Sequence, residues 1–303
     1  MAQMSELLNL QGQMFLLIIV GIVLKKRGIL PDSAKTILTD LLLCFVLPCN
    51  IINSFRMEFS LDTLGKFGMV LVCAVLIQAV AYILSRVLYN KEPEALKKVL
   101  QYVTIVSNSG FLGLPIVEEV FGGEGLMYAS VFIVPMRIMM WTAGIACFTG
   151  ESDKKAAFKK VIVHPCIIAV YIGLFLLFSQ WELPGVLDKT IRGAGGCTTT
   201  ISMIIIGLIL AEVDMRQLFN REVFETMIVR LVVLPVFALI IAKLLGLSEL
   251  LTGVAVVLTA MPAGSTSAML AAKYNGDYKF ASKCIVCTTI ASLLTIPIWC
   301  MII

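Results

Sequence analysis

The sequence predicts an all-α membrane protein with ten transmembrane helices, arranged as an inverted five-plus-five repeat in which helices four and nine are broken and cross. Three observations predict this fold. The 303 residues are 59% hydrophobic and only 15% charged, whereas soluble domains contain about 25% charged residues. The apolar residues form long runs separated by short polar segments, and lysine and arginine gather at alternate ends of these runs.

The apolar runs give the predicted helices in order. A spanning helix needs roughly 20 apolar residues. Runs of about this length cover residues 10–25, 36–55, 66–88, 98–121, 126–149, 161–179, 190–211, 224–245, 250–275 and 280–302. The N-terminus has no basic region followed by a small-residue cleavage site, so we expect no cleaved signal peptide.

The basic residues orient these spans. Of the 24 lysines and arginines, seventeen fall in one set of loops and five in the other. Cytoplasmic loops carry the excess of positive charge. We therefore expect a multi-pass protein of the plasma membrane with both termini outside the cytoplasm.

The basic loop 150–160 divides the chain into two halves of five spans each. Because five is odd, the second half must insert upside down relative to the first, which is the arrangement of an inverted repeat. We expect a first five-helix repeat at 1–149, a cytoplasmic linker at 150–160 and a second, inverted repeat at 161–303. Similar pairs at the ends of spans four and nine, Gly-Glu and Ala-Ser against Gly-Asp and Ala-Ser, give weak support.

Spans four and nine both contain helix-breaking and polar residues at corresponding places. Proline removes a backbone donor, and hydrocarbon tolerates freed backbone groups only where they face protein or a water-filled cavity. Paired interruptions of this kind indicate a transporter binding site, because half-helix N-termini attract anionic groups. The alternative is that these residues only kink the helices. The predicted substrate-binding residues in the two breaks are Asn108, Ser109, Gly110, Pro115, Pro262, Gly264, Ser265 and Thr266.

The segments "SNSGFLGLPI" and "AMPAGSTSAMLAAKYN" resemble the auxin efflux carrier family, which includes plant carriers and bacterial relatives. The family pattern Asn-Thr…Gly-x-Pro corresponds here to Asn108-Ser109, Gly113 and Pro115, with serine in place of threonine. The resemblance implies the crossover fold of bile-acid and sodium/proton transporters. It also implies elevator-type movement of a transport domain, and carboxylates such as malonate or indole-type acids as substrates.

Two further residues complete the predicted substrate-binding set. Arg137 lies about halfway along the fifth span, where a charge costs about 2.5–3.5 kcal/mol. It is interpreted as a counter-charge for a carboxylate; the alternatives are a structural pair with Glu118 or Glu119, or hydrogen bonds to broken-helix carbonyls. Asn50 in the second span either lines the substrate path or joins helices.

Most of the other polar residues within the predicted spans are expected to have structural roles. We expect Arg230 to snorkel to the headgroups, Gln78 to bond between helices, and the hydroxyls of 198–202 to bond to carbonyls of their own helix. The single histidine, His164, is expected to be structural. Glu118 and Glu119 either bind a coupling cation or are solvated. The nine cysteines are read as small apolar residues.

The predicted function is secondary transport of a small organic anion by an elevator-type alternating-access mechanism. The alternatives are an anion channel and a membrane sensor of the same ligand. The chain lacks a phosphate-binding loop, a His-Glu-x-x-His pair and any recognisable nucleophile–base set, so we expect no enzyme, no cofactor and no metal site. The expected partners are the anion and the lipid bilayer, without nucleic acid. A coupling proton or sodium ion and a homodimer are left open.

Overall fold

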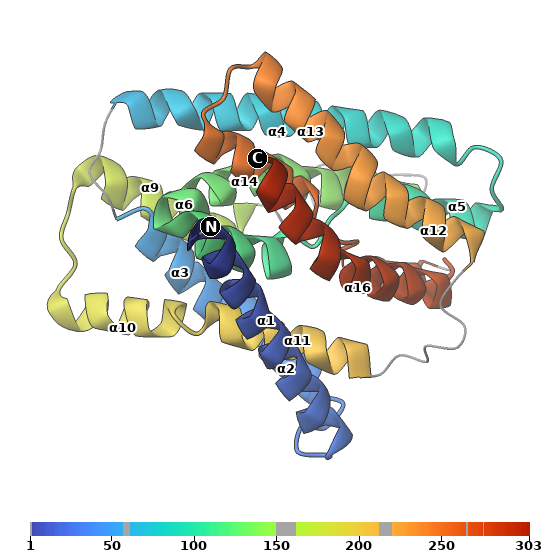
Figure 1. The fold of residues 1–303 in the computed structure, drawn as a ribbon, viewed down its shortest axis with the longest axis horizontal. Coiled ribbons are helices and arrows are strands. Elements are labelled where there is room, and N and C mark those ends of the chain that lie inside the picture. Colours follow the sequence, from blue (N-terminus) through green and yellow to red (C-terminus); the bar gives the residue numbers. More distant parts are fainter. Residues whose placement is uncertain (1, 57–60, 150–161, 212–219, 265, 275) are drawn as a thin grey trace. The chain divides into compact units, whose positions relative to one another are not determined.

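The computed structural model describes residues 2–56, 61–149, 162–211, 220–264, 266–274 and 276–303 (Figure 1). In the described ranges the regular secondary structure consists of helices joined by short turns and irregular segments, with one isolated bridge between Ser107 and Ala263. The predicted linker at 150–160 lies outside the described residues.

The helices follow one another with several π-helical turns, labelled η, between them. They are α1 Ala2–Lys26, α2 Ala34–Leu41, η1 Leu42–Val46, α3 Leu47–Ser54, α4 Leu61–Leu88, α5 Glu94–Ile105, η2 Ser109–Gly113, α6 Leu114–Met139, η3 Met140–Gly144, α7 Ile145–Thr149, α9 Pro165–Ser179, α10 Gly185–Gly195, α11 Thr198–Ala211, α12 Arg221–Ile228, η5 Val229–Val233, α13 Leu234–Leu244, α14 Glu249–Thr259, α15 Thr266–Lys273 and α16 Tyr278–Ile302.

In the described part of the chain, six helical runs are long and apolar enough to cross a membrane. They cover Ala34–Ser54, Asp62–Leu88, Leu114–Phe148, Gly185–Ala211, Arg221–Leu244 and Tyr278–Ile302. Two shorter apolar helices, α9 and α14, accompany them. The protein is therefore an all-helical membrane protein, and the count of ten spans stays a prediction.

The run 114–148 joins the end of the predicted fourth span to the predicted fifth span. Gly122 interrupts it with φ 69° and ψ −167°, outside the helical region. A positive φ is easily adopted only by glycine. The loop expected between the two spans is thus reduced to a break at this glycine.

The chain divides into two compact units. The first unit comprises residues 1–63, 114–130 and 163–214; the second comprises 64–113, 131–162 and 215–303. Each unit takes segments from both of the predicted repeats, so segments distant in sequence build each core.

In the first unit, α1 packs against α11, and the two helices cross in the view of Figure 1. A Cβ atom added to Gly21 would lie 2.5 Å from the backbone oxygen of Ile204, and one added to Gly207 would lie 2.2 Å from that of Ile18. Small residues let helices approach closely in membranes. The contact between these two backbones therefore requires both glycines.

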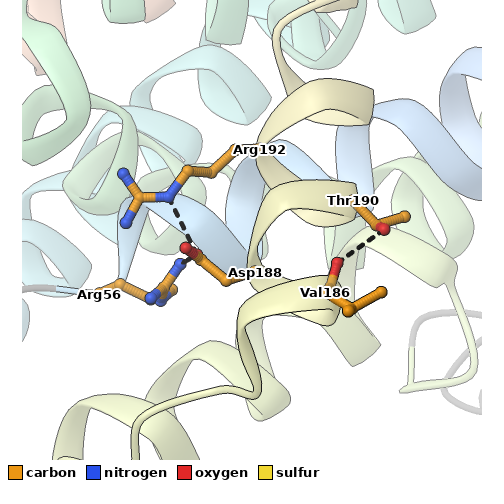
Figure 2. Close-up of polar contacts among 5 residues, drawn as sticks. All are labelled: Arg56, Val186, Asp188, Thr190 and Arg192. Atoms are coloured by element: carbon orange, nitrogen blue, oxygen red, sulfur yellow. Dashed lines mark hydrogen bonds and ion pairs between the residues drawn. The ribbon is translucent and has the colours of Figure 1, made fainter.

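Polar contacts fix one edge of the first unit. Asp188 on α10 accepts a hydrogen bond from Arg192 Nε at 2.9 Å, and it also pairs with Arg56, which follows α3 (Figure 2). The Asp188 side chain is 22% exposed, so water screens these charges and the pairs contribute modestly to stability.

In the second unit, α14 and the C-terminal half of α5 form the core. Residues 99–110 and 251–264 have no exposed position among those described, and α16 packs against both helices. Trp299 Nε1 on α16 donates to the Leu231 carbonyl at 2.8 Å. The interrupted backbone of this unit is thus surrounded by protein, as hydrocarbon requires.

Candidate functional site at the two helix breaks

Both predicted breaks are real interruptions, and both lie in the second unit. The first follows α5, which ends at Ile105; Val106 is extended, with φ −110° and ψ 117°, and the helix resumes at Ser109. The second follows α14, which ends at Thr259, and the helix resumes at Thr266. Pro262 helps to hold this second break open, because it lacks a backbone donor and disfavours a helical conformation for Met261.

The two breaks bind each other through their backbones. Asn108 N donates to the Pro262 carbonyl at 2.8 Å, and Gly264 N donates to the Val106 carbonyl at 3.1 Å. These bonds flank the antiparallel bridge between Ser107 and Ala263. Each interruption therefore satisfies backbone groups that the other leaves without helical partners.

Hydroxyl groups reinforce this contact. Ser109 Oγ donates to the Leu258 carbonyl at 2.9 Å and also pairs with the Ser107 hydroxyl. Ala263 N donates to Thr288 Oγ1 on α16 at 3.1 Å. Ser109 thus ties the start of the resumed helix to the end of α14, which is a structural contribution beyond its predicted role toward a substrate.

The side chain of Asn108 lies at the first break. Its residue is 6% exposed, and its carboxamide makes no hydrogen bond with the part of the chain that the structure describes. Buried polar groups without a partner are costly. The carboxamide is therefore suited to bind a ligand or an ordered water molecule.

Arg137 lies against the turn that follows the first break. The residue is 5% exposed, and a Cβ atom added to Gly110 would lie 2.8 Å from Arg137 Nη2. Gly110 therefore leaves the room that the guanidinium occupies. This places a positive charge beside the first turn of the resumed helix, where an anion would also be attracted by the helix dipole.

Arg230 does not reach the headgroups, so the snorkelling prediction is wrong. The residue is 3% exposed. Its Nη1 donates to the Thr104 carbonyl at 2.9 Å, and its Nε and Nη2 donate to those of Met261 and Thr259 at 3.0 and 3.2 Å. The guanidinium lies inward because the carbonyls at helix C-termini lack helical partners and attract a cation.

A small cavity adjoins Arg230 and the two breaks. Its polar lining consists of Gln78, Ser107, Ser109, Arg230 and Thr259, and it has space for about one water molecule. The Oε1 atom of Gln78 is buried and accepts no hydrogen bond from the described residues. This oxygen therefore does not form the interhelical bond expected of Gln78, and a water molecule would satisfy it.

Comparison with known proteins identifies the family. A family model described as membrane transport protein matches residues 12–300. The chain belongs to this membrane transport protein family. It is 27% identical over 297 residues to an uncharacterized transporter of Methanothermobacter thermautotrophicus, covering 94% of this chain and 95% of that protein. It is 25% identical over 297 residues to one of Methanocaldococcus jannaschii, covering 94% of both.

The family match confirms the resemblance to auxin efflux carriers and identifies the protein as a membrane transporter rather than an enzyme. The relatives are described only as transporters. Neither the substrate nor the mechanism of this membrane transport protein follows from their names.

The second unit of this membrane transport protein contains most of the predicted substrate-binding residues. Those described in it are Asn108, Ser109, Gly110, Arg137, Pro262, Gly264 and Thr266. Thr266 Oγ1 pairs with the Tyr102 hydroxyl at 2.8 Å. Ser265 lies outside the described residues.

The other two predicted residues belong to the first unit. Pro115 lies at the start of α6, directly after the π-helical turn η2. Asn50 Nδ2 donates to Glu118 Oε2 at 2.6 Å, and Thr199 Oγ1 donates similarly to Glu119 Oε1 at 3.1 Å. The two glutamates are thus held by side chains from the second and seventh predicted spans.

At the remaining polar positions, the structural role predicted for His164 is confirmed, and the one predicted for the hydroxyls of 198–202 is met at Thr198. His164 caps α9 by accepting a hydrogen bond from Cys166 N at 3.2 Å. Thr198 Oγ1 donates to the Gly195 carbonyl at 2.6 Å. The hydroxyls of Thr199 and Ser202 depart from this pattern: Thr199 reaches Glu119, and the buried Ser202 Oγ bonds to none of the described residues.

Proposed function

We propose that this membrane transport protein is a secondary transporter of a small organic anion, with carboxylates as the substrate class. The observation that carries the proposal is the contact between the two interrupted segments, with the Asn108 carboxamide and the Arg137 guanidinium beside it. Transporters built on broken helices bind substrates at such interruptions.

The chemistry of this region suits a carboxylate. A guanidinium presents several donors in a planar fork that matches a carboxylate. The start of the resumed helix adds the positive end of a helix dipole. Asn108 contributes a neutral donor. Together these groups replace the hydration that an anion loses when it leaves water, without requiring a second full charge.

The division into two units supports an elevator-type alternating-access mechanism. Both interruptions, Arg137 and Arg230 belong to the second unit, so that unit can carry the site as one body. In the proposed mechanism the second unit moves relative to the first and exposes the site to each side in turn. The ten-helix inverted repeat, the plasma-membrane location and the extracytoplasmic termini belong to the same proposal.

Exchange in proteoliposomes tests this function. Purified protein is reconstituted with an unlabelled carboxylate inside, and a panel of labelled carboxylates is added outside. A transporter takes up label faster when unlabelled substrate is inside. Empty liposomes provide the baseline. Conduction without exchange would indicate an anion channel, and saturable binding without flux would indicate a sensor; either result would replace the proposal.

A further inference from the structure

Arg230 joins the C-terminal ends of both half-helices with one guanidinium. The Thr104 carbonyl belongs to the last turn of α5, while those of Thr259 and Met261 lie at the end of α14 and in the break that follows. Three of the donors of Arg230 are therefore used on carbonyls of the two segments whose interruptions pair.

These carbonyl groups are of the kind that bind coupling cations. In transporters with broken helices, unwound carbonyls and half-helix C-terminal ends coordinate sodium ions or protons. The negative ends of two helix dipoles converge on such a place, and a positive charge there is stabilised. In this protein the positive charge belongs to the side chain of Arg230, which is part of η5.

The remaining space beside the guanidinium is small. The adjoining cavity, lined by Gln78, Ser107, Ser109 and Thr259, has room for about one water molecule. A metal cation at these carbonyls would have to displace the guanidinium, which is held by three hydrogen bonds.

We propose that Arg230 is a built-in cation that takes the place of a coupling sodium ion, so that the transport cycle needs no sodium. This inference rests on the proposed transport function. It makes Arg230 a positioning residue, because the guanidinium holds the two half-helices together and does not itself contact the substrate. Since no sodium accompanies the substrate, uptake does not respond to a sodium gradient.

The first test needs no variant. Carboxylate exchange by wild-type protein is measured with sodium on both sides of the membrane and again with choline replacing it. We expect the same rate in both media. A rate that falls when sodium is removed would overturn the proposal.

The second test asks whether the site takes a guanidinium. Arg230→Ala is expected to lower exchange by about tenfold or more, because three buried carbonyls lose their donor. Guanidinium ion at millimolar concentration should restore part of the exchange and raise the Tm of this variant, whereas choline should do neither. Arg221→Ala is the matched control, because that side chain is 85% exposed, and it should behave as wild type.

These readouts separate the inference from the proposed function. If wild-type protein exchanges no carboxylate, the function fails, while the guanidinium-dependent rise in Tm of Arg230→Ala in detergent still tests the site. If Arg230→Ala does not fold, Arg230→Lys retains the charge with fewer donors and should show a Tm below that of the wild type and sodium-independent exchange. Exchange by Arg230→Lys that requires sodium, or a Tm equal to that of the wild type, would then overturn the inference. An Arg230→Ala protein with the Tm and exchange rate of wild type would overturn the inference.

Discussion

At the scale of single residues, the buried polar side chains of the second unit differ in whether the protein uses them. Ser109, Thr266 and Arg230 form hydrogen bonds with other groups of the protein. The Asn108 carboxamide makes none with the described chain. A side chain that is buried and forms no hydrogen bond with the described residues is the better candidate for binding a ligand.

Replacing Asn108 with alanine should therefore weaken transport without weakening the fold. We expect exchange to fall about ten-fold or more, the effect of losing a hydrogen bond to a charged group, while the Tm changes little. Ser130→Ala is the control, because among the described residues its hydroxyl bonds to the Leu126 carbonyl of its own helix alone. Unchanged exchange by Asn108→Ala would remove this residue from the site.

Arg137 should discriminate by charge. Arg137→Gln is expected to weaken binding of a carboxylate by about ten-fold, because it removes a charge-assisted hydrogen bond in a weakly hydrated place, and to affect a neutral amide analogue much less. Competition by both compounds against a labelled carboxylate measures the difference. Equal losses for the two compounds would show that Arg137 does not recognise the charge.

Sequence reasoning located the breaks but not all their partners. Proline and glycine act on the adjacent backbone, so Pro262 and Gly264 predict an interruption from local chemistry alone. The partners of Arg230 lie 126 residues away at Thr104 and about 30 residues away in the second break. Nothing next to Arg230 in sequence indicates them, and its place near a span end favoured snorkelling instead.

At the scale of elements, the positions of the helices could be predicted from local sequence, whereas the packing of one helix against another could not. Apolar runs predicted nearly all of the helical segments, because hydropathy is a local property. The close contact between α1 and α11 depends on Gly21 and Gly207, which are far apart in sequence. Glycine within a helix gives no sign by itself of which helix it will meet.

The α1–α11 contact gives a stability prediction. Gly21→Val places a side chain within 2.5 Å of the Ile204 carbonyl oxygen and should destabilise the protein by about 1–3 kcal/mol through overpacking. Gly12→Val is the matched control on α1, where nothing lies within 4 Å of the added Cβ. Thermal unfolding in detergent measures both. A Gly21→Val protein as stable as the control would mean that the two helices do not approach this closely.

At the scale of the whole molecule, the two units do not coincide with the two predicted repeats. Each unit combines segments from both halves of the chain. This mixing is expected when related halves intertwine. The sequence pattern alone could not predict it, because hydropathy gives the spans and their orientation but not which spans share a core. The ten-span inverted repeat itself stays a prediction.

Elevator movement predicts that distances between the two units change during transport, whereas distances within each unit do not. Spin labels placed on two helices of the second unit should keep their separation when a carboxylate is added. Labels placed one on each unit should shift in their distance distribution as the second unit moves. Double electron–electron resonance measures both pairs in liposomes. A change within the second unit, with none between units, would exclude rigid movement.

The most direct test of the central claim is equilibrium binding of a labelled carboxylate to the purified protein. The account predicts saturable binding by the wild type and loss of that binding in the double variant Asn108→Ala, Arg137→Gln, with Ser130→Ala binding as tightly as the wild type. A double variant that binds the carboxylate as tightly as the wild type would contradict a substrate site at the paired helix breaks.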